Sequence, residues 1–203
     1  MNIDIKVSNR PISYIKAMKF LNKRVEEIKE DRNCELLWIL EHPTIYTAGI
    51  RFDEKEILDK KIKVIKTNRG GKITLHNPGQ KIVYFVLNLN KRKKDIRKLI
   101  SAVELSIIEF LKIHKIIAKK DQNNIGIWVN GKKIAAIGLK ISRWIAYHGC
   151  SININNDLNK YLKIIPCGLS NENITSIHRE GKELINNANK KLVGIFIKNI
   201  NNI

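Results

Sequence analysis

The sequence IGIWVNGKKIAAIGLKISRWIAYHGCSINI, residues 125–154, decides the fold. Residues 125–129 and 133–142 have the apolar and alternating character of strands. The Asn130-Gly131 dipeptide between them favours the tight turn that pairs two antiparallel strands. Residues 144–154 have the character of a further strand. We therefore expect a β-hairpin here, followed by one more strand.

Outside this stretch, the sequence alternates between strand and helix patterns. The other expected strands, recognised as short apolar runs, are 36–40, 64–66, 73–76 and 81–89. The expected helices are about 13–31, which Ser13 can cap, 95–114 and 187–199. Because helices alternate irregularly with hairpin-linked strands, we expect an α/β (α+β) fold, a mixed β-sheet flanked by helices.

Length and composition are those of an ordinary globular domain. The chain has 203 residues, of which 43% are hydrophobic and 28% charged, which excludes disorder, collagen and coiled coil. We expect one domain over 1–203. No apolar stretch approaches the roughly 20 residues that span a bilayer, and the N-terminus lacks the apolar core of a signal peptide. The three cysteines are odd in number and form no CxxC motif, as in a cytoplasmic protein.

The net charge is strongly positive and has two explanations. The 38 Lys+Arg less 19 Asp+Glu give +19, and the pI is about 9.9. Such a charge suggests a nucleic-acid partner, but Ile, Asn and Lys are also the residues that an AT-rich genome overproduces. The basic run at 91–98 is either a solvated face or a docking surface for an acidic protein or a phosphate backbone. Charge alone does not decide the function.

The segment RGGKITLHNPGQ, residues 69–80, is a candidate ligand-binding loop. The paired glycines Gly70 and Gly71 let the backbone approach a ligand closely, and Arg69 could neutralise an anion beside them. The simpler interpretation is a tight turn with a solvated arginine. The segment is not a phosphate-binding P-loop, because it lacks the Gly-Lys-Ser/Thr ending.

Three other segments carry candidate chemistry. Small residues after Lys133 leave space for an apolar ligand or for a neighbouring helix. Cys167 lies between a proline and a glycine, which suits a presented thiol, although a lone cysteine is more often a buried hydrophobe. A nucleophilic thiol needs a positive neighbour, for which Lys133 or His76 could serve. His148-Gly149-Cys150-Ser151 is either a further ligand segment or a satisfied histidine beside a packed cysteine.

No metal is expected, because the histidines show no ligand spacing with one another or with the cysteines. These histidines are His42, His76, His114, His148 and His178.

Taken together and in order, RGGKITLHNPGQ, GKKIAAIGLKI, HGCSININ and IPCG resemble the octanoyltransferases of lipoate biosynthesis, the lipoate-protein ligase B type. The match in spacing and order runs from about Leu36 to Ile177. The resemblance implies a fold like the catalytic domain of biotin and lipoate protein ligases. It also implies transfer of an octanoyl group to a lysine through an acyl-thioester intermediate, with no cofactor.

The resemblance implies roles for individual residues. Cys167 matches the acyl-thioester cysteine of the family, and Lys133 matches the lysine that lowers the pKa of that thiol. The substrate-contacting residues would be Arg69, Gly70, Gly71, Lys72, Ile73, Thr74, Leu75, His76, Ala136, Ile137, Gly138, Gly149, Cys150 and Ser151. Asn77 and the Cys150-Ser151 pair depart from the usual family pattern, and we expect both departures to lie near the acyl site. Backbone N–H groups around Gly70–Gly71 or 136–138 could stabilise the oxyanion.

The implied partners are octanoyl-acyl carrier protein as donor, and lipoyl domains of 2-oxoacid dehydrogenase complexes and the glycine cleavage H protein as acceptors. Neither nucleic acid nor a membrane is expected. Two alternatives remain open at this point. One is an ATP-dependent lipoate ligase of the same fold, against which the Pro166-Cys167-Gly168 segment argues because a ligase needs no nucleophilic cysteine. The other is a basic nucleic-acid-binding module, which composition alone supports.

Overall fold

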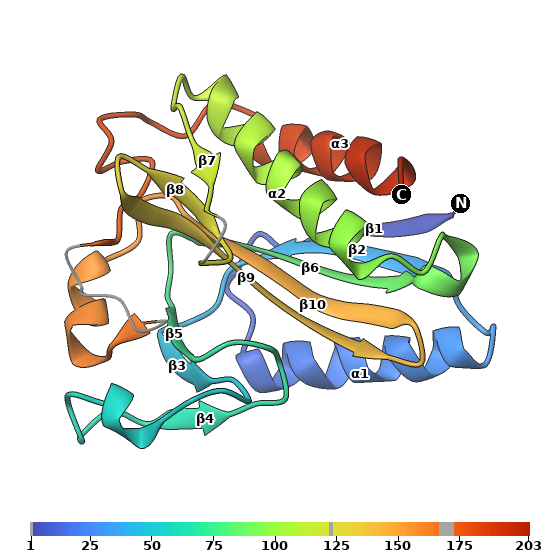
Figure 1. The fold of residues 1–203 in the computed structure, drawn as a ribbon, viewed down its shortest axis with the longest axis horizontal. Helices are drawn as coiled ribbons and strands as arrows, with labels where there is room; N and C mark the ends of the chain where they lie inside the picture. The colour runs from blue at the N-terminus through green and yellow to red at the C-terminus, as the bar shows by residue number, and fades with distance from the viewer. Residues whose placement is uncertain (1, 122–123, 167–172) are drawn as a thin grey trace.

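Two layers of helices enclose one large sheet. The computed structural model describes residues 2–121, 124–166 and 173–203, so Cys167 lies outside the described residues. Figure 1 shows α2 (Ile96–Ile113) and α3 (Ala188–Asn201) on one face of the sheet and α1 (Tyr14–Lys29) on the other. The expected mixed sheet flanked by helices is confirmed.

The large sheet has seven strands, of which one neighbouring pair, β1 and β2, is parallel and the others are antiparallel. In spatial order they are β1 (Ile3–Val7), β2 (Glu35–Leu40), β6 (Gln80–Asn88), β10 (Ile145–Asn153), β9 (Lys132–Ser142), β8 (Ile127–Val129) and β7 (Lys119–Lys120). A second, three-stranded sheet consists of β4 (Val64–Lys66), β3 (Ile45–Ala48) and β5 (Ile73–His76).

The central strands are continuous apolar runs because both of their faces are buried. In β2, Leu36, Trp38 and Leu40 pack with α1, whereas Leu37 and Ile39 belong to the cluster beneath α2 and α3. Residues of β6 alternate in the same way between the two clusters. Side chains of a strand point to opposite faces in turn, so one run supplies two cores.

The hairpin of β8 and β9 forms as expected. Asn130 and Gly131 have φ values of +49° and +77°, the left-handed backbone that a tight hairpin turn requires. The strand β10 then pairs with β9 from Ile145 opposite Ser142 to Ile152 opposite Ala135. Residues of both strands line the candidate site.

Some elements were not expected from the sequence. They are β1, β3, β7 and the short 3-10 helices Glu54–Glu56, Leu89–Lys91 and Leu158–Lys163. Ser13 precedes α1 but makes no side-chain capping bond, whereas the Asp95 side chain accepts from Lys98 N at the start of α2. Within the described residues, no helix is both long enough and apolar enough to span a membrane.

Candidate active site

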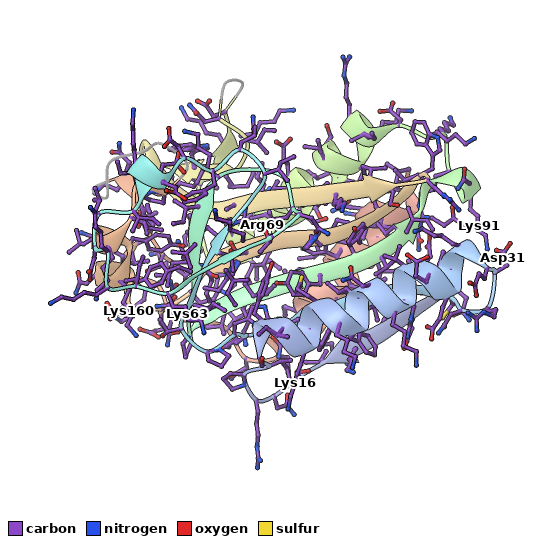
Figure 2. The ribbon with its side chains drawn as sticks, turned by 90° about the horizontal axis from the view of Figure 1, so that it is seen from below. Lys16, Asp31, Lys63, Arg69, Lys91 and Lys160 are labelled. Atoms are coloured by element: carbon purple, nitrogen blue, oxygen red, sulfur yellow. The ribbon has the colours of Figure 1, made fainter. Side chains whose placement is uncertain are left out.

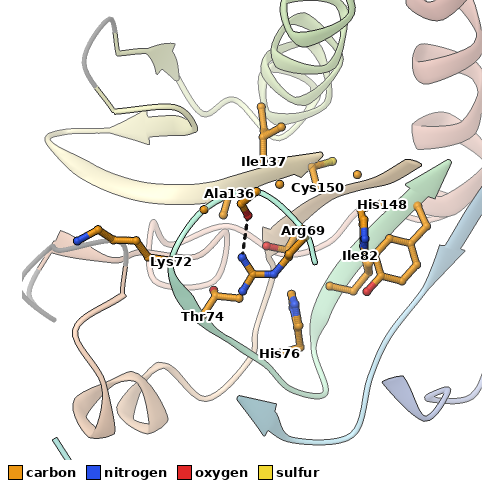
Figure 3. A pocket seen from close by; sticks show the side chains of 15 residues that line it. Arg69, Lys72, Thr74, His76, Ile82, Ala136, Ile137, His148 and Cys150 are labelled. Carbon is orange, nitrogen blue, oxygen red and sulfur yellow. Dashed lines mark hydrogen bonds between the residues drawn. The ribbon is translucent and has the colours of Figure 1, made fainter. Parts of the chain in front are cut away.

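A cavity lies between the β9–β10 pair and the loop 69–72, which connects β4 to β5 and covers it (Figure 3). Its volume is about 60 Å³. Gly70 N donates to Leu139 O of β9 at 3.1 Å, and a Cβ at Gly70 would lie only 3.1 Å from that oxygen. Gly71 has a φ of +90°, which L side chains rarely adopt. The paired glycines therefore allow the close backbone approach that covers the cavity.

The Arg69 guanidinium holds the loop to the small sheet. It donates to Thr47 O at 2.7 Å, to Thr47 Oγ1 at 2.9 Å and to Gly70 O at 3.0 Å, and only 8% of the residue is exposed. These acceptors, on β3 and on the loop itself, place the Arg69 guanidinium in the cavity wall. The interpretation of Arg69 as a solvated residue of a turn is wrong.

Most of the expected substrate-contacting residues line this cavity. They are Arg69, Gly70, Gly71, Lys72, Thr74, His76, Ala136, Ile137, Gly138, Gly149, Cys150 and Ser151. The Lys72 ammonium at its margin is also paired with the Glu56 carboxylate at 2.6 Å. Segments from three different parts of the chain thus meet at one place.

Ile73 and Leu75 do not line the cavity. Both are fully buried in a separate cluster with Tyr46 and Tyr161. Residues alternate along β5, so Thr74 and His76 face the cavity while Ile73 and Leu75 face away from it. These two residues stabilise the small sheet that carries the cavity wall.

The side chains of Ile137 and Cys150 also point away from Arg69, toward α2 (Figure 3). Both contribute to the apolar cluster beneath α2 and α3. Cys150 is 4% exposed, and burial raises the pKa of its thiol well above the usual value. Cys150 is therefore a packed cysteine whose thiol is not a nucleophile.

A second, smaller cavity of about 20 Å³ adjoins the first and shares Thr74, Ala136 and Ser151 with it. Lys133 and Pro166 both line this second cavity. Cys167 is bonded to Pro166 in the chain and lies outside the described residues. Small residues, among them Ala136 and Ser151, line both cavities, and Lys133 lines the second one.

Lys133 is a buried lysine rather than the solvated residue that strand starts usually carry. It is 8% exposed, its Nζ donates to Ile125 O at 3.0 Å, and Nζ lies 5.0 Å from the centre of the Trp128 ring. Gly126 makes room for it, because a Cβ there would lie 2.7 Å from Lys133 Cε. The carbonyl and the aromatic face together fix the position of the ammonium.

Two buried histidines, His76 and His148, line the first cavity, and a third, His42, lies behind His76 with ring centres 5.6 Å apart. Burial lowers the pKa of His42 to about 4, that of His76 to about 3 and that of His148 to about 4. Nearby positive groups add to the effect at His76 and His148. All three rings are neutral at pH 7, so His76 cannot be the positive neighbour of a thiol. Lys133 is left as the cation of the expected pair.

His76 and His42 are also tied into hydrogen bonds. His76 Nδ1 lies 2.7 Å from Gln80 Oε1 and therefore carries the proton, while His42 Nε2 lies 2.9 Å from the Tyr84 hydroxyl. Tyr14, at the start of α1, stacks on His76 with ring centres 6.2 Å apart. The histidines thus join α1, β5 and β6 at the end of the cavity.

Sequence reasoning did not assign Ile82 and Tyr84 to the site and gave His148 only as part of a possible ligand segment, yet all three line the cavity. Ile82 and Tyr84 lie in the apolar run of β6, and such a run predicts only that its residues are buried in the core. The sequence does carry a signal at His148. This histidine precedes a glycine in the middle of a strand, where glycine often marks a bulge or a close approach of another backbone.

Asn77, which we expected near the acyl site, directly follows the cavity residue His76. Asn77 does not line the cavity. It is 1% exposed, its Nδ2 donates to Asp157 O at 2.9 Å, and its Oδ1 accepts from Asn156 Nδ2 at 3.0 Å. This departure from the usual family pattern therefore ties the β5–β6 turn to the segment after β10.

The sequence matches that of a known protein family and of curated relatives. The family described as lipoyl protein ligase A/B catalytic domain matches residues 13–193. An octanoyltransferase of Wolbachia sp. subsp. Brugia malayi is 42% identical over 180 residues, covering 86% of this chain and 88% of that protein. An octanoyltransferase of Anaplasma marginale (strain Florida) is 40% identical, covering 88% and 86%.

Solved structures share the fold at low sequence identity. Lipoate-protein ligase A bound with ATP gives a TM-score of 0.79 at 14% identity, covering 99% of this chain and 86% of that one. A biotin protein ligase from Aquifex aeolicus gives 0.52 at 17%, covering 100% and 70%. These likenesses concern the fold, whereas the sequence matches concern the family. The chain belongs to the lipoyl protein ligase A/B catalytic-domain family, and within it to the octanoyltransferases.

Proposed function

We propose that this enzyme transfers an octanoyl group from octanoyl-acyl carrier protein to the ε-amine of a lysine on a lipoyl domain, through a thioester on Cys167. The observation that carries the proposal is the pair of adjoining cavities. They run from Lys133 and Pro166, the neighbour of Cys167, past Ala136 and Ser151. One end thus holds the Lys133 ammonium and Pro166, and the other is a narrow space between the β9–β10 pair and the 69–72 loop.

The chemistry takes place in two balanced steps. The Cys167 thiolate attacks the carbonyl carbon of the donor thioester, a new carbon–sulfur bond forms, and the bond between that carbon and the carrier sulfur breaks. The carrier leaves as a thiol with the proton that the Cys167 thiol gave up. The lysine amine of the acceptor then attacks the acyl-enzyme, an amide bond forms, and Cys167 recovers its thiol with the proton from the amine. The first step exchanges one thioester for another, and the amide drives the second, so no ATP is needed. Covalent catalysis divides the transfer between two separate protein encounters.

Lys133 would activate the thiol. A free cysteine has a pKa of about 8.5, so only a few per cent is thiolate at neutral pH. A nearby ammonium favours the charged form of the thiol and lowers that pKa. The Ile125 carbonyl and the Trp128 ring keep the Lys133 ammonium in place on the cavity wall. The backbone N–H of Gly70 is engaged by Leu139 O, which leaves it out of an oxyanion site in this conformation.

The apolar tail of the substrate would occupy the first cavity. At about 0.8 kcal/mol per buried CH₂, a seven-carbon tail gains roughly 5 kcal/mol from a dry site. The neutral histidines at the far end suit such a tail, because charged rings would require water.

The surface suits acidic partners. Lys16 on α1 and Lys63 before β4 lie at the surface in Figure 2, while Arg69 lies inside. The net charge of +19 would steer an acidic acyl carrier protein and acidic lipoyl domains toward the molecule. The acceptors would be the lipoyl domains of 2-oxoacid dehydrogenase complexes and the glycine cleavage H protein.

Intact-mass analysis after incubation with octanoyl-acyl carrier protein tests the proposal. We expect one octanoyl group on Cys167, retained in Cys34→Ser and absent in Cys167→Ser. Lys133→Met should acquire the group slowly, with the rate restored at higher pH. If Cys167→Ser still transfers octanoate to a lipoyl domain near the normal rate, the thioester mechanism is wrong. Pyrophosphate release that depends on ATP and lipoate would instead support a ligase.

A further inference from the structure

His148 has a backbone conformation that redirects its side chain. Its φ is +69° in the middle of β10, where regular strand backbone has negative φ. Strand alternation would place it with Ala146 and Cys150 in the cluster beneath α2 and α3. Instead it lines the cavity on the opposite face (Figure 3) and stacks on Tyr147 with ring centres 4.9 Å apart.

The next residue, Gly149, allows the His148 side chain to point to the opposite face of the sheet. Its close backbone contact with β6 leaves no room for a small adjustment. Gly149 has a φ of +159°, and a Cβ there would lie 1.9 Å from Val83 O of β6. Glycine alone fits at that position. Strained backbone in an otherwise regular strand persists when the surrounding structure imposes it and often marks a functional site. The His148-Gly149 pair therefore invites a functional explanation.

His148 separates two spaces. On one side is the cavity lined by Ala136 and Ser151. On the other is a groove of about 700 Å³ between α1 and residues 65–68, which His148 also lines. The groove includes Met18 of α1, and Asn68 Oδ1 lies 3.2 Å from His148 Nε2, which fixes the ring in place. The residue is 3% exposed and so acts as a wall between the cavity and the groove.

The length of the cavity matches the substrate. Ser151, shared with the Lys133 cavity, and His148 are separated along β10 by about 10 Å at roughly 3.3 Å per strand residue. An extended octanoyl chain has seven carbon–carbon bonds of about 1.5 Å, which advance roughly 9 Å along a zigzag. A tail whose carbonyl carbon lies beside Ser151, in the cavity that Lys133 also lines, would thus end against the His148 ring.

We propose that His148 is the specificity-determining residue that ends the acyl cavity, and that its removal joins the cavity to the groove and admits longer acyl chains. This inference rests on the proposed octanoyl transfer. The groove beyond His148 is large enough for additional methylenes, and its Ile15, Met18 and Ile65 side chains give it apolar walls.

The test measures transfer to a lipoyl domain from acyl carrier protein donors of six, eight, ten and twelve carbons. The two variants are His148→Ala and His148→Gly. Glycine suits the positive φ, so it protects the test against misfolding. The matched control is His178→Ala, because His178 is exposed on the surface. We expect the twelve-to-eight-carbon ratio of kcat/KM to rise at least tenfold in both His148 variants and to stay unchanged in His178→Ala.

Refilling the groove provides a second check. His148→Ala combined with Met18→Trp should return the ratio toward that of the unsubstituted enzyme. The proposal is overturned if folded His148 variants keep the original ratio, including the case in which all chain lengths slow in parallel. Because the readout is the amide on the lipoyl domain, it is independent of Cys167 chemistry. A failed Cys167 thioester with an altered ratio would refute the mechanism and retain the role of His148.

Discussion

Placing a larger side chain at Ala136 should block the acyl path. Ala136 lies opposite Ser151 in the β9–β10 pair and lines both the Lys133 cavity and the cavity beneath the 69–72 loop. Ala136→Val adds two carbons and Ala136→Ile adds three at the point that the tail must pass. Both new residues favour strand structure, so the ladder itself should tolerate them.

The expected loss of activity follows from the number of substrate methylenes that the larger side chain displaces from the cavity. If each added carbon displaces about one buried CH₂, Val removes about 1.6 kcal/mol and Ile about 2.4 kcal/mol of tail burial. These values correspond to losses in kcat/KM for octanoyl transfer of roughly 15-fold and roughly 60-fold. The first cavity, about 60 Å³, has little spare volume in which the tail could be re-routed.

The assay compares octanoyl transfer to a lipoyl domain by both variants with that by Ala118→Val, which enlarges a partly buried alanine outside both cavities. Thermal unfolding verifies that the Ala136 variants remain folded, because overpacking a strand face can itself destabilise by 1–3 kcal/mol. If folded Ala136→Ile transfers octanoate within about threefold of the unsubstituted enzyme, the tail does not pass Ala136, and the proposed path is wrong.

Three further predictions concern the fold, pH and salt. Gly149→Ala should lose at least about 3 kcal/mol of unfolding free energy in urea, because its Cβ would meet Val83 O at 1.9 Å. The matched Gly194→Ala, in the open interior of α3, should gain about 0.5–1 kcal/mol; equal effects would contradict the clash. His42 and His148 have folded pKa values of about 4 against 6.5 unfolded, so the unfolded state binds more protons between these values. Urea melts should therefore show stability falling as pH drops from about 6.5 toward 4, by up to about 3 kcal/mol per histidine, and a flat profile would contradict their neutral burial. Added NaCl should lower kcat/KM for the acyl carrier donor at least about threefold between low and physiological ionic strength, but not for a small uncharged thioester. If kcat/KM fell equally with salt for the two donors, the +19 charge would not steer the acyl carrier protein.

The sequence predicted the long central strands of the large sheet and missed the two strands at its edges. Residues 36–40 and 81–89 are continuous apolar runs because both faces of β2 and β6 are covered. The edge strand β1 is largely exposed, and β7 consists of Lys119 and Lys120. β7 has no apolar residue, so hydrophobic periodicity cannot detect it. β1 does alternate between apolar and polar residues, but the pattern covers only five residues at one edge of the sheet.

At the site, family motifs identified segments, and strand alternation sorted the residues within them. Ile73 and Leu75 belong to the motif, yet they face the apolar cluster on the other side of the small sheet, because side chains alternate between the two faces of a strand. Tyr84 was hidden in an apolar run. The direction of His148 could not be predicted from periodicity, because its left-handed backbone breaks the alternation that such reasoning assumes.

The same residues explain how a chain with a charge of +19 can bind an apolar tail. An excess of surface lysines acts on the encounter with acidic proteins over distances near the Debye length of about 8–10 Å. Inside, His76 and His148 are kept neutral by burial, and Arg69 is held by the Thr47 and Gly70 oxygens. Lys133 places its ammonium at the cavity beside Pro166, where a thiolate would need it. Charge would thus serve delivery and thiol activation, while the row of small residues between Lys133 and His148 remains suited to methylenes.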